Sequence, residues 1–364
     1  MSLLVAKIGT SSLTDERGVI DRGMIAQVAT QVSALRNQGH RVVLVSSGAV
    51  AAGLEALKME RPKDVLTKQV ASAVGQSRLM RVWDDALDVH GLVSGQVLLV
   101  PNDFFDRTQY LHARRTLQRL LEMGVVPVIN ENDAIADDEI RFGDNDRIAA
   151  LVAHLLGADV LVLLTDLAGL FTADPRTDSS ASLIESVDEV TADLELAAGS
   201  SGSHRGSGGM ASKLRAAKIA SWSGVRVVIA AARRPDVLLE ALNSTPGVGT
   251  QVRAHDRRLS ARKLWIAFAV DVVGRITVDE GARRALVDRG VSLLPAGAVQ
   301  ISGDFGDGDA VDIAGPDGKV FARGLTKWAA ADAKAAVGRR SAELTDGFPH
   351  ELVHRDDLVI IPAT

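Results

Sequence analysis

Cysteine is absent from this chain of 364 residues. Its absence excludes disulfide bonds, zinc–thiolate sites, iron–sulfur clusters and cysteine nucleophiles. Long hydrophobic runs are also missing, because no apolar stretch approaches the roughly 18 residues that a membrane-spanning helix needs. The N-terminal residues carry no basic segment of the kind that begins a signal peptide. We therefore expect a cytoplasmic protein without a membrane-spanning segment.

Several catalytic motifs are missing too. The sequence has no Gly-x-Ser-x-Gly, no His-Glu-x-x-His and no Walker A spacing. The net charge of −5 argues against electrostatic binding of nucleic acid or anionic membranes by the chain as a whole. Gly206–Ala211 fits the loose dinucleotide pattern, but it follows a Gly/Ser loop where that pattern requires a strand. We therefore reject a dinucleotide site there.

From residue 1 to about 260, short apolar segments alternate with segments of helical periodicity. Val160–Leu164 is apolar at every position, which is typical of a strand buried on both faces. Helices should therefore cover both faces of a mainly parallel sheet. The expected strands are Leu3–Ile8, Arg41–Ser46, Gly95–Val100, Val125–Ile129, Asp159–Leu164 and Val225–Ala230; the expected helices lie between Asp21 and Gly39 and near 67–89, 106–123, 145–156 and 211–223.

After residue 260 the pattern changes to short segments separated by glycine, aspartate and proline. Such spacing predicts a small β-rich domain. We predict a first domain at 1–258, a linker at 259–270 and a second domain at 271–364. The expected strands of the second domain are Arg275–Val278, Val299–Ser302, Ala310–Ile313, Val320–Leu325 and Leu358–Ile361.

Two lysines stand beside glycine-bearing turns. Lys7 lies in a strand that runs into Gly9-Thr10-Ser11, and Lys213 closes the glycine-rich stretch that begins at Gly206. Free backbone N–H groups and a lysine at such points suit a polyphosphate, so the pair indicates phosphoryl transfer. The simpler interpretation is a strand-end lysine at position 7 and a solvated helix residue at position 213.

Two polar clusters accompany the lysines. Asn130–Asp133 follows an expected strand, and Gly143–Asp146 opens an expected helix. Each cluster alone is explained by a turn or an N-cap. Because ligands bind at the carboxyl ends of parallel strands, the clusters could instead hold the ammonium and carboxylate groups of an amino acid. Ser47-Gly48 would add a hydroxyl and backbone N–H groups for an anionic group.

Taken together, these residues resemble the amino acid kinase family, and within it the members that act on glutamate and carry a C-terminal PUA domain. The resemblance extends over the whole chain. Ser207 stands where the family usually has threonine, and both residues offer a hydroxyl. The motifs that carry the resemblance are Val5–Ser11, Ser46–Ala49, Ala73–Ser77, Ile129–Asp133, Gly143–Asp146, Leu164–Asp166 and Ser207–Lys213.

The resemblance implies a three-layer αβα sandwich with a mainly parallel sheet, plus the small PUA domain. It implies ATP-dependent phosphorylation of the L-glutamate side-chain carboxylate, the first step of proline biosynthesis. Mg²⁺ would be carried mainly by the ATP phosphates, with no metal ligand assigned to the protein. L-Proline would be a feedback inhibitor, and the protein would be a homo-oligomer, either a dimer or a tetramer.

The resemblance also implies roles for individual residues. Lys7 and Lys213 would flank the transferring phosphoryl group, and Asp146 would orient them. Because an acyl phosphate hydrolyses readily, a closing loop that excludes water would be useful, and the glycine-rich segment Gly199–Gly209 fits such a lid. The residues expected to hold glutamate are Ser47, Asn130, Asp133, Asp144 and Asn145. The residues expected at the nucleotide are Lys7, Gly9, Thr165, Asp166, Ser207, Gly208, Gly209, Met210, Ala211, Ser212 and Lys213.

Two alternatives stay open at this point. One is another amino acid or carbamate kinase with the same fold. The other is RNA binding, which is typical of PUA domains. Residues 271–364 hold 11 Lys/Arg and 15 Asp/Glu, and this acidic balance argues against phosphate binding. A local group of arginines at 283, 284 and 289 keeps the RNA alternative open.

Overall fold

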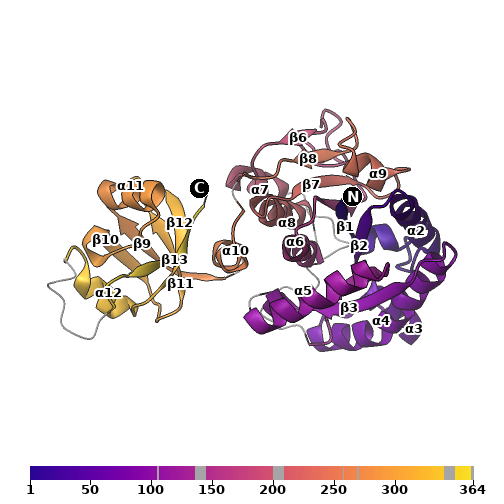
Figure 1. Ribbon diagram of the computed structural model, residues 1–364, viewed down its shortest axis with the longest axis horizontal. Helices are drawn as coiled ribbons and strands as arrows, with labels where there is room; N and C mark the ends of the chain where they lie inside the picture. The colour runs from indigo at the N-terminus through magenta and orange to yellow at the C-terminus, as the bar shows by residue number, and fades with distance from the viewer. Residues whose placement is uncertain are drawn as a thin grey trace. The chain divides into compact units, whose positions relative to one another are not determined.

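The computed structural model describes most of the chain as two compact units, Met1–Arg258 and Leu259–Thr364 (Figure 1). No helix in the described part is long and apolar enough to cross a membrane. The described residues are 1–104, 106–135, 145–199, 209–256, 258–268, 270–339 and 349–361.

The first unit is built on an eight-stranded sheet with the order β3-β4-β2-β1-β5-β7-β8-β6. Neighbouring strands are parallel except for the pair β7 and β8. The strands are β1 (Leu3–Ile8), β2 (Arg41–Ser46), β3 (Ser94–Leu99), β4 (Val126–Glu131), β5 (Val160–Thr165), β6 (Ser186–Val187), β7 (Arg226–Ala231) and β8 (Thr250–Val252).

Helices cover both faces of this sheet. On one face, α2 (Arg22–Asn37), α4 (Val65–Asp88) and α9 (Val237–Leu242) share a buried core with Leu4, Ala6 and Ile8 of β1. On the other face lie α5 (Arg107–Glu122), α6 (Asn145–Leu156) and α8 (Met210–Trp222). The remaining helices are α1 (Thr10–Leu13), α3 (Ala49–Leu57), α7 (Ala192–Gly199) and the short 3-10 helix η1 (Pro101–Phe104). The predicted three-layer sandwich is thus confirmed.

The sequence explains where these helices begin. Asp21, Asp64 and Asp106 are the N-caps of α2, α4 and α5, and each carboxylate accepts a hydrogen bond from the backbone N–H three residues later. Such caps satisfy donors that have no partner within the helix. At the other end of α2, Gly39 has a φ of +82°, as expected of the residue that stops the helix.

Alternation along β1 decides which face each side chain reaches. Because successive side chains of a strand point to opposite faces, the core contacts of Ala6 and Ile8 send Lys7 between them to the opposite face. There α6 packs directly against β1. A lysine inside an otherwise apolar strand is therefore aimed at the first turn of α6.

Two strands run further than their apolar residues indicate. β4 ends at Glu131, two residues beyond the expected Ile129, and β5 ends at Thr165. Asn130 and Glu131 still pair with Leu98 and Leu99 of β3, because backbone hydrogen bonding, and not side-chain polarity, decides where a strand ends. The prediction that Asn130 follows the strand was therefore wrong.

The second unit is a five-stranded sheet with the order β10-β9-β11-β12-β13 and its own apolar core. The predicted β-rich C-terminal domain is confirmed, and it also contains helices. Helix α10 (Ala261–Phe268), within the region expected to be a linker, packs Ile266 and Ala267 against Leu325 and Val359. The other elements are β9 (Val272–Val278), α11 (Glu280–Arg289), the 3-10 helix η2 (Pro295–Gly297), β10 (Ala298–Gly303), β11 (Ala310–Ala314), β12 (Val320–Thr326), α12 (Ala330–Ala336) and β13 (Val353–Ile360).

Helices α3 and α4 pack with their backbones in close contact. A Cβ atom on Gly75 would overlap the carbonyl oxygen of Ala49, and one on Gly53 would overlap the carbonyl oxygen of Ala71. Both overlaps are with backbone, which cannot rotate away. Only glycine therefore permits this approach.

We expect Gly75→Ala to lower the free energy of unfolding by about 3 kcal/mol, because overpacking at a backbone contact forces the two helices apart. Urea unfolding followed by circular dichroism measures the change. Gly23→Ala is the matched control, since a Cβ there would meet only the Asp21 side chain. Equal stabilities for the Gly75→Ala variant and the unsubstituted chain would contradict the close packing of α3 on α4.

Candidate active site

Polar residues collect at the carboxyl ends of four neighbouring parallel strands. Gly9 follows β1, Ser47 follows β2, Asn130 lies near the end of β4, and Thr165 ends β5. Since β4, β2, β1 and β5 are adjacent and parallel, these ends lie along one edge of the sheet. Sequence segments more than 150 residues apart therefore meet there, at the position where α/β sheets bind their ligands.

Asp146, in the first turn of α6, is ion-paired with both Lys7 and Lys213. Its Oδ1 is 2.7 Å from Lys7 Nζ, and its Oδ2 is 3.3 Å from Lys213 Nζ. The Ser212 hydroxyl also donates a hydrogen bond of 2.6 Å to Oδ2. The structure thus brings together the three residues predicted to act at the phosphoryl group.

The burial of both lysines removes the simpler interpretations of them. Lys7 is 4% exposed and Lys213 is 5% exposed, so neither extends into solvent. Lys213 lies in the first turn of α8, which begins after Gly209. Gly9 leaves room for Lys7, because a Cβ at that position would lie 3.3 Å from Lys7 Nζ.

Asp146 is a buried carboxylate whose partners favour its ionised form. Burial alone would raise the pKa of its carboxyl group, but attraction to Lys213 and Lys7 and hydrogen bonds from Lys7 and Ser212 outweigh burial and hold the pKa well below its usual range. The carboxyl group is therefore ionised at neutral pH. Its role is to hold the two lysine ammonium groups.

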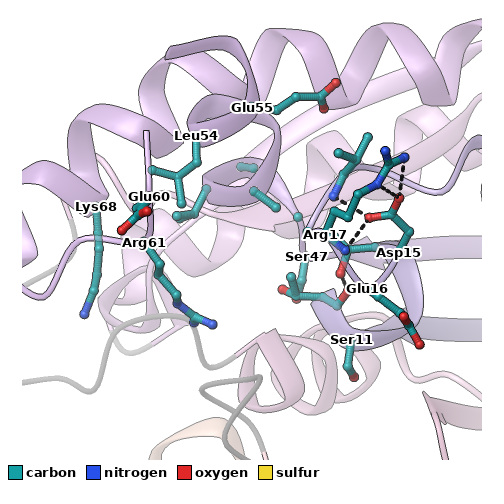
Figure 2. Close-up of a pocket in the computed structure, with 18 of the residues that line it drawn as sticks. Ser11, Asp15, Glu16, Arg17, Ser47, Leu54, Glu55, Glu60, Arg61 and Lys68 are labelled. Carbon is teal, nitrogen blue, oxygen red and sulfur yellow. Dashed lines mark hydrogen bonds and ion pairs between the residues drawn. The ribbon is translucent and has the colours of Figure 1, made fainter. Parts of the chain in front are cut away.

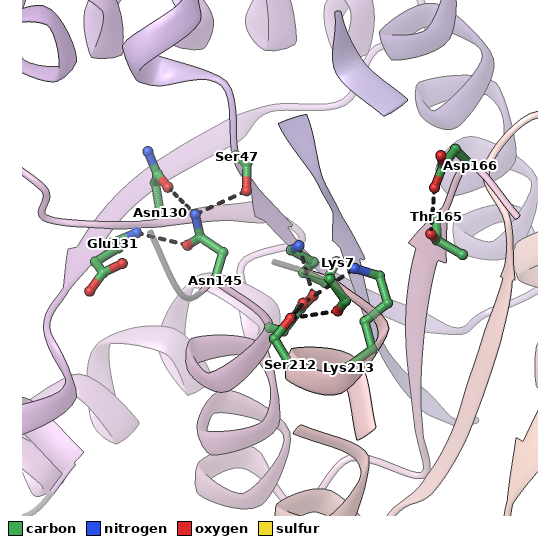
Figure 3. A network of polar contacts seen from close by, with 11 residues as sticks. Lys7, Ser47, Asn130, Glu131, Asn145, Thr165, Asp166, Ser212 and Lys213 are labelled. Atoms are coloured by element: carbon green, nitrogen blue, oxygen red, sulfur yellow. Dashed lines mark hydrogen bonds and ion pairs between the residues drawn. The ribbon is translucent and has the colours of Figure 1, made fainter. Parts of the chain in front are cut away.

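Asn145, the residue beside Asp146, connects the other half of the site. Its Nδ2 donates to Ser47 Oγ at 3.1 Å and to Asn130 Oδ1 at 2.8 Å, and its Oδ1 accepts from the backbone N–H of Glu131 at 3.0 Å. Figure 3 shows this network beside the lysine cluster. The first two residues of α6, Asn145 and Asp146, thus contact the carboxyl ends of β2, β4 and β1.

Asp133 is a buried carboxylate with one unpartnered oxygen. The Ser72 hydroxyl donates to its Oδ2 at 2.9 Å, while Oδ1 has no hydrogen-bond partner among the described residues. Burial raises the pKa of Asp133 to about 6, against the lowering effect of the Ser72 hydrogen bond. A buried acceptor of this kind is suited to a cationic group of a ligand.

On the far side of the lysines, Thr165 Oγ1 donates to Asp166 Oδ1 at 3.0 Å, and Asp166 Oδ2 pairs with Arg176 at 2.7 Å. Gly209 caps α8 without a side-chain hydrogen bond, so backbone N–H groups there are available to phosphate oxygens. Met210 and Ala211 are half-buried at the start of the same helix. Asp144, Ser207, Gly208 and most of the expected closing segment lie outside the described residues.

A pocket of about 1290 Å³ lies at this edge of the sheet. Ser47, Asn130, Asp133 and Asn145 line it, and so does Asp166 from the other cluster. Figure 2 shows two segments that line it, the loop that carries Asp15, Glu16 and Arg17 and the α3–α4 connection that carries Glu60 and Arg61. The cleft therefore extends from four of the residues expected to hold glutamate to Asp166, one of the residues expected at the nucleotide.

Three contacts at the site were not predicted from the sequence. Ser72 and Gln76 hydrogen-bond to Asp133 and Asn130, and Arg176 pairs with Asp166. Gln76 lies in one of the motifs that carry the family resemblance, but nothing in that motif assigned it a partner. No group of three or more acidic or histidine side chains among the described residues could hold a metal ion.

Comparison with known proteins decides the family. The model of the amino acid kinase family matches residues 2–231. This chain belongs to the amino acid kinase family. The model of the PUA domain matches residues 274–348, so the C-terminal domain predicted for this amino acid kinase is confirmed.

Relatives match this amino acid kinase over nearly its full length. Glutamate 5-kinase of Burkholderia multivorans is 44% identical over 98% of this chain and 97% of its own length. Glutamate 5-kinases of Mycobacterium ulcerans and Deinococcus radiodurans are 45% and 46% identical, again over 98% of this chain and over 96% and 99% of their own lengths. The resemblance predicted from the motifs is confirmed.

Among solved structures, carbamate kinase from Giardia lamblia bound to AMP-PNP is similar to this kinase. It covers 69% of this chain and 98% of its own, with 18% identity and a TM-score of 0.49.

The raised pKa of Asp133 predicts a pH-dependent effect of Asp133→Asn on stability. Below pH 3.8, the pKa of the group in the unfolded chain, the carboxyl group is protonated in both the folded and the unfolded state. Above about pH 6 it is ionised in both states, so the folded state then bears the full free-energy cost of burying the charged carboxylate. From about pH 4.5 to about pH 7.5, the stability of the variant relative to the unsubstituted chain should rise by about 2 kcal/mol.

Urea unfolding at the two pH values measures this difference. Asp85→Asn, the same substitution at an exposed position, is the matched control. A relative stability of the Asp133→Asn variant that stays constant with pH would contradict the presence of a buried, poorly compensated carboxylate at this position.

Proposed function

We propose that this amino acid kinase transfers the γ-phosphoryl group of ATP to the side-chain carboxylate of L-glutamate. The product would be L-glutamyl 5-phosphate, and the reaction would be the first step of proline biosynthesis. The observation that carries the proposal is the adjacency of Asn145 and Asp146: one belongs to an amide and hydroxyl network suited to an amino acid, the other to a lysine cluster suited to phosphate. The full-length similarity to glutamate 5-kinases supports the choice of acceptor.

The reaction needs no general base. A carboxylate oxygen of glutamate attacks the γ-phosphorus, the bond from that phosphorus to the oxygen bridging it to ADP breaks, and no proton moves. The obstacle is the approach of two anions, so positioning and charge compensation carry the catalysis. This requirement matches a site whose central carboxylate stays ionised and holds two lysines.

The lysine cluster would compensate the charge that spreads over the transferring group. Lys7 approaches from β1 and Lys213 from α8, and Asp146 fixes both ammonium groups at distances of 2.7 and 3.3 Å. Fixed charges in a buried site stabilise a transition state without reorganising during the reaction. The backbone N–H groups at the start of α8 would bind phosphate oxygens, and Mg²⁺ carried by ATP would neutralise further phosphate charge.

The amino acid would occupy the Asn145 side of the pocket. The unpartnered Oδ1 of Asp133 would accept from the α-ammonium group. Ser47 Oγ accepts from Asn145, so its own hydrogen can point to a carboxylate of the substrate. Gly48, with a φ of +111°, places the N-terminus of α3 beside that hydroxyl.

The choice of acceptor is the direct test of this proposal. We expect kcat/KM for L-glutamate to exceed that for N-acetyl-L-glutamate, L-aspartate and UMP by roughly 100-fold or more. N-Acetylglutamate lacks the ammonium group, and aspartate is one methylene shorter. A coupled assay of ADP release, with each acceptor at saturating MgATP, makes the comparison. A preference for any of the other acceptors would refute the assignment to glutamate.

Each lysine should be needed for turnover. We expect Lys7→Ala and Lys213→Ala to lower kcat by roughly 100-fold or more, because each removes a fixed charge from the transition state. Lys218→Ala is the matched control, since Lys218 lies on the same helix as Lys213 but pairs with Glu195 at 2.8 Å. Turnover close to that of the unsubstituted enzyme would remove that lysine from the mechanism.

Proline should compete with glutamate, because it shares the α-carboxylate and a cationic α-nitrogen that Ser47 and Asp133 would bind. Its ring has no side-chain carboxylate, so it would occupy the pocket without reacting. Initial rates at varied glutamate and proline should show a raised KM for glutamate and an unchanged kcat. Rates insensitive to millimolar proline would exclude this form of inhibition.

A further inference from the structure

Helix α4 carries none of the residues expected to bind glutamate or ATP, yet three of its side chains hydrogen-bond to residues at or just beyond the carboxyl ends of β2 and β4. They are Ser72, Gln76 and Trp83, spaced by four and then seven residues. At 3.6 residues per turn this spacing keeps the three side chains within about 40° of one another around the helix axis. One face of α4 is therefore directed at the strand ends.

Ser72 determines how Asp133 is presented. The buried hydroxyl of Ser72 donates to Oδ2 at 2.9 Å, and this bond leaves Oδ1 as the unpartnered oxygen among the described residues. Asp133 lines the pocket in this orientation. Without the Ser72 hydroxyl, no hydrogen bond from α4 would restrain rotation of the Asp133 carboxylate.

Gln76 completes a chain of donors and acceptors with a fixed direction. The backbone N–H of Glu131 can only donate, so the side-chain atom of Asn145 that faces it must be the oxygen. The Asn145 amide nitrogen then faces Asn130 Oδ1, and Asn130 Nδ2 donates to Gln76 Oε1 at 2.8 Å. Figure 3 shows the Asn130 oxygen turned toward Asn145 and its nitrogen turned away. Gln76 Oε1 is thus the acceptor at the end of this chain of hydrogen bonds.

The helix itself is held in place close to the site. Trp83 Nε1 donates to Ser46 Oγ at 2.9 Å, and the Ser46 hydroxyl donates to the carbonyl oxygen of Ser47. The glycine contacts between α3 and α4 fix the helix against an element that begins two residues after Ser47. The position of Ser72 and Gln76 relative to the strand ends is therefore set by the fold.

We propose that Ser72 and Gln76 are positioning residues of the amino acid site, which act through Asp133 and Asn130 to set the affinity for the acceptor. The lysine cluster is built from β1, α6 and α8, so these two side chains leave turnover and nucleotide affinity nearly unchanged. The identity of the acceptor as glutamate rests on the proposed function. The positioning role of Ser72 and Gln76 does not depend on which acceptor the enzyme uses.

Steady-state kinetics of the full-length enzyme test the proposal. Ser72→Ala and Gln76→Leu should each raise KM for glutamate by roughly 10-fold, as expected for a lost hydrogen bond at a buried polar group, with kcat and KM for ATP within about twofold. Gln76→Glu keeps the acceptor oxygen and should restore most of the affinity. Ser77→Ala, at an exposed position on the same helix, should change nothing.

A double-substitution cycle separates positioning from a general structural effect. If Ser72 acts through Asp133, Ser72→Ala should add little to the KM increase of Asp133→Asn. The kcat/KM profile gives a second readout: loss of the Ser72 hydrogen bond removes an interaction that lowers the Asp133 pKa, so the acidic limb should move to higher pH.

The positioning role would be overturned by additive KM effects of Ser72→Ala and Asp133→Asn or by a kcat/KM profile that does not move with pH in the Ser72→Ala variant. It would also be overturned if KM for glutamate did not change, or if kcat fell as much as the affinity. If the unsubstituted enzyme prefers another acceptor, the same measurements are made on the KM of that acceptor. That result would refute glutamate as the substrate while the positioning proposal is still decided by the variants.

Discussion

The ion-paired contact of Asp146 with Lys7 and Lys213 is the constraint on which the rest of the site depends. Two buried ammonium groups would repel each other and would be costly to desolvate without a carboxylate between them. The ion pairs tie β1, α6 and α8 together at the carboxyl edge of the sheet. Since Asn145 is the neighbour of Asp146, placing the lysine cluster also places the amide network that joins Ser47, Asn130 and Glu131.

Asp146 and Asp133, two of the buried carboxylates, differ because their surroundings differ. Attraction and hydrogen bonds from its partners hold the pKa of Asp146 well below the usual range despite burial. Burial raises the pKa of Asp133 to about 6, and Ser72 compensates it only in part. The first carboxylate supports the fold and the lysines, whereas the second leaves one acceptor for a ligand and weakens the folded state at neutral pH.

Much of the first unit could be predicted from its residues. The uninterrupted apolar run in β5 indicated a sheet covered on both faces, and the predicted limits of β1 and β2 agree with the structure. The glycines beside Lys7 and Lys213 indicated phosphate chemistry. The grouping of Lys7, Lys213 and Asp146 came from the family resemblance, because no local pattern brings residues 7, 146 and 213 together.

What could not be predicted depends on tertiary contact. Ser72 reaches Asp133 across 61 residues and Gln76 reaches Asn130 across 54, and only the packing of α4 brings them into range. The extension of β4 through Asn130 depends on pairing with β3, which overrides the polarity of the side chain. Likewise, the charged segment expected to be a linker forms α10, since its apolar residues have partners on β12 and β13.

The effect of Asp146→Asn on kcat tests the central claim most directly. The substitution keeps the size of the side chain and removes the charge that holds the lysines. With folding verified by circular dichroism, we expect kcat to fall by roughly 100-fold or more, because the two ammonium groups lose their common anchor. A folded Asp146→Asn variant that turns over at nearly the original rate would contradict the account.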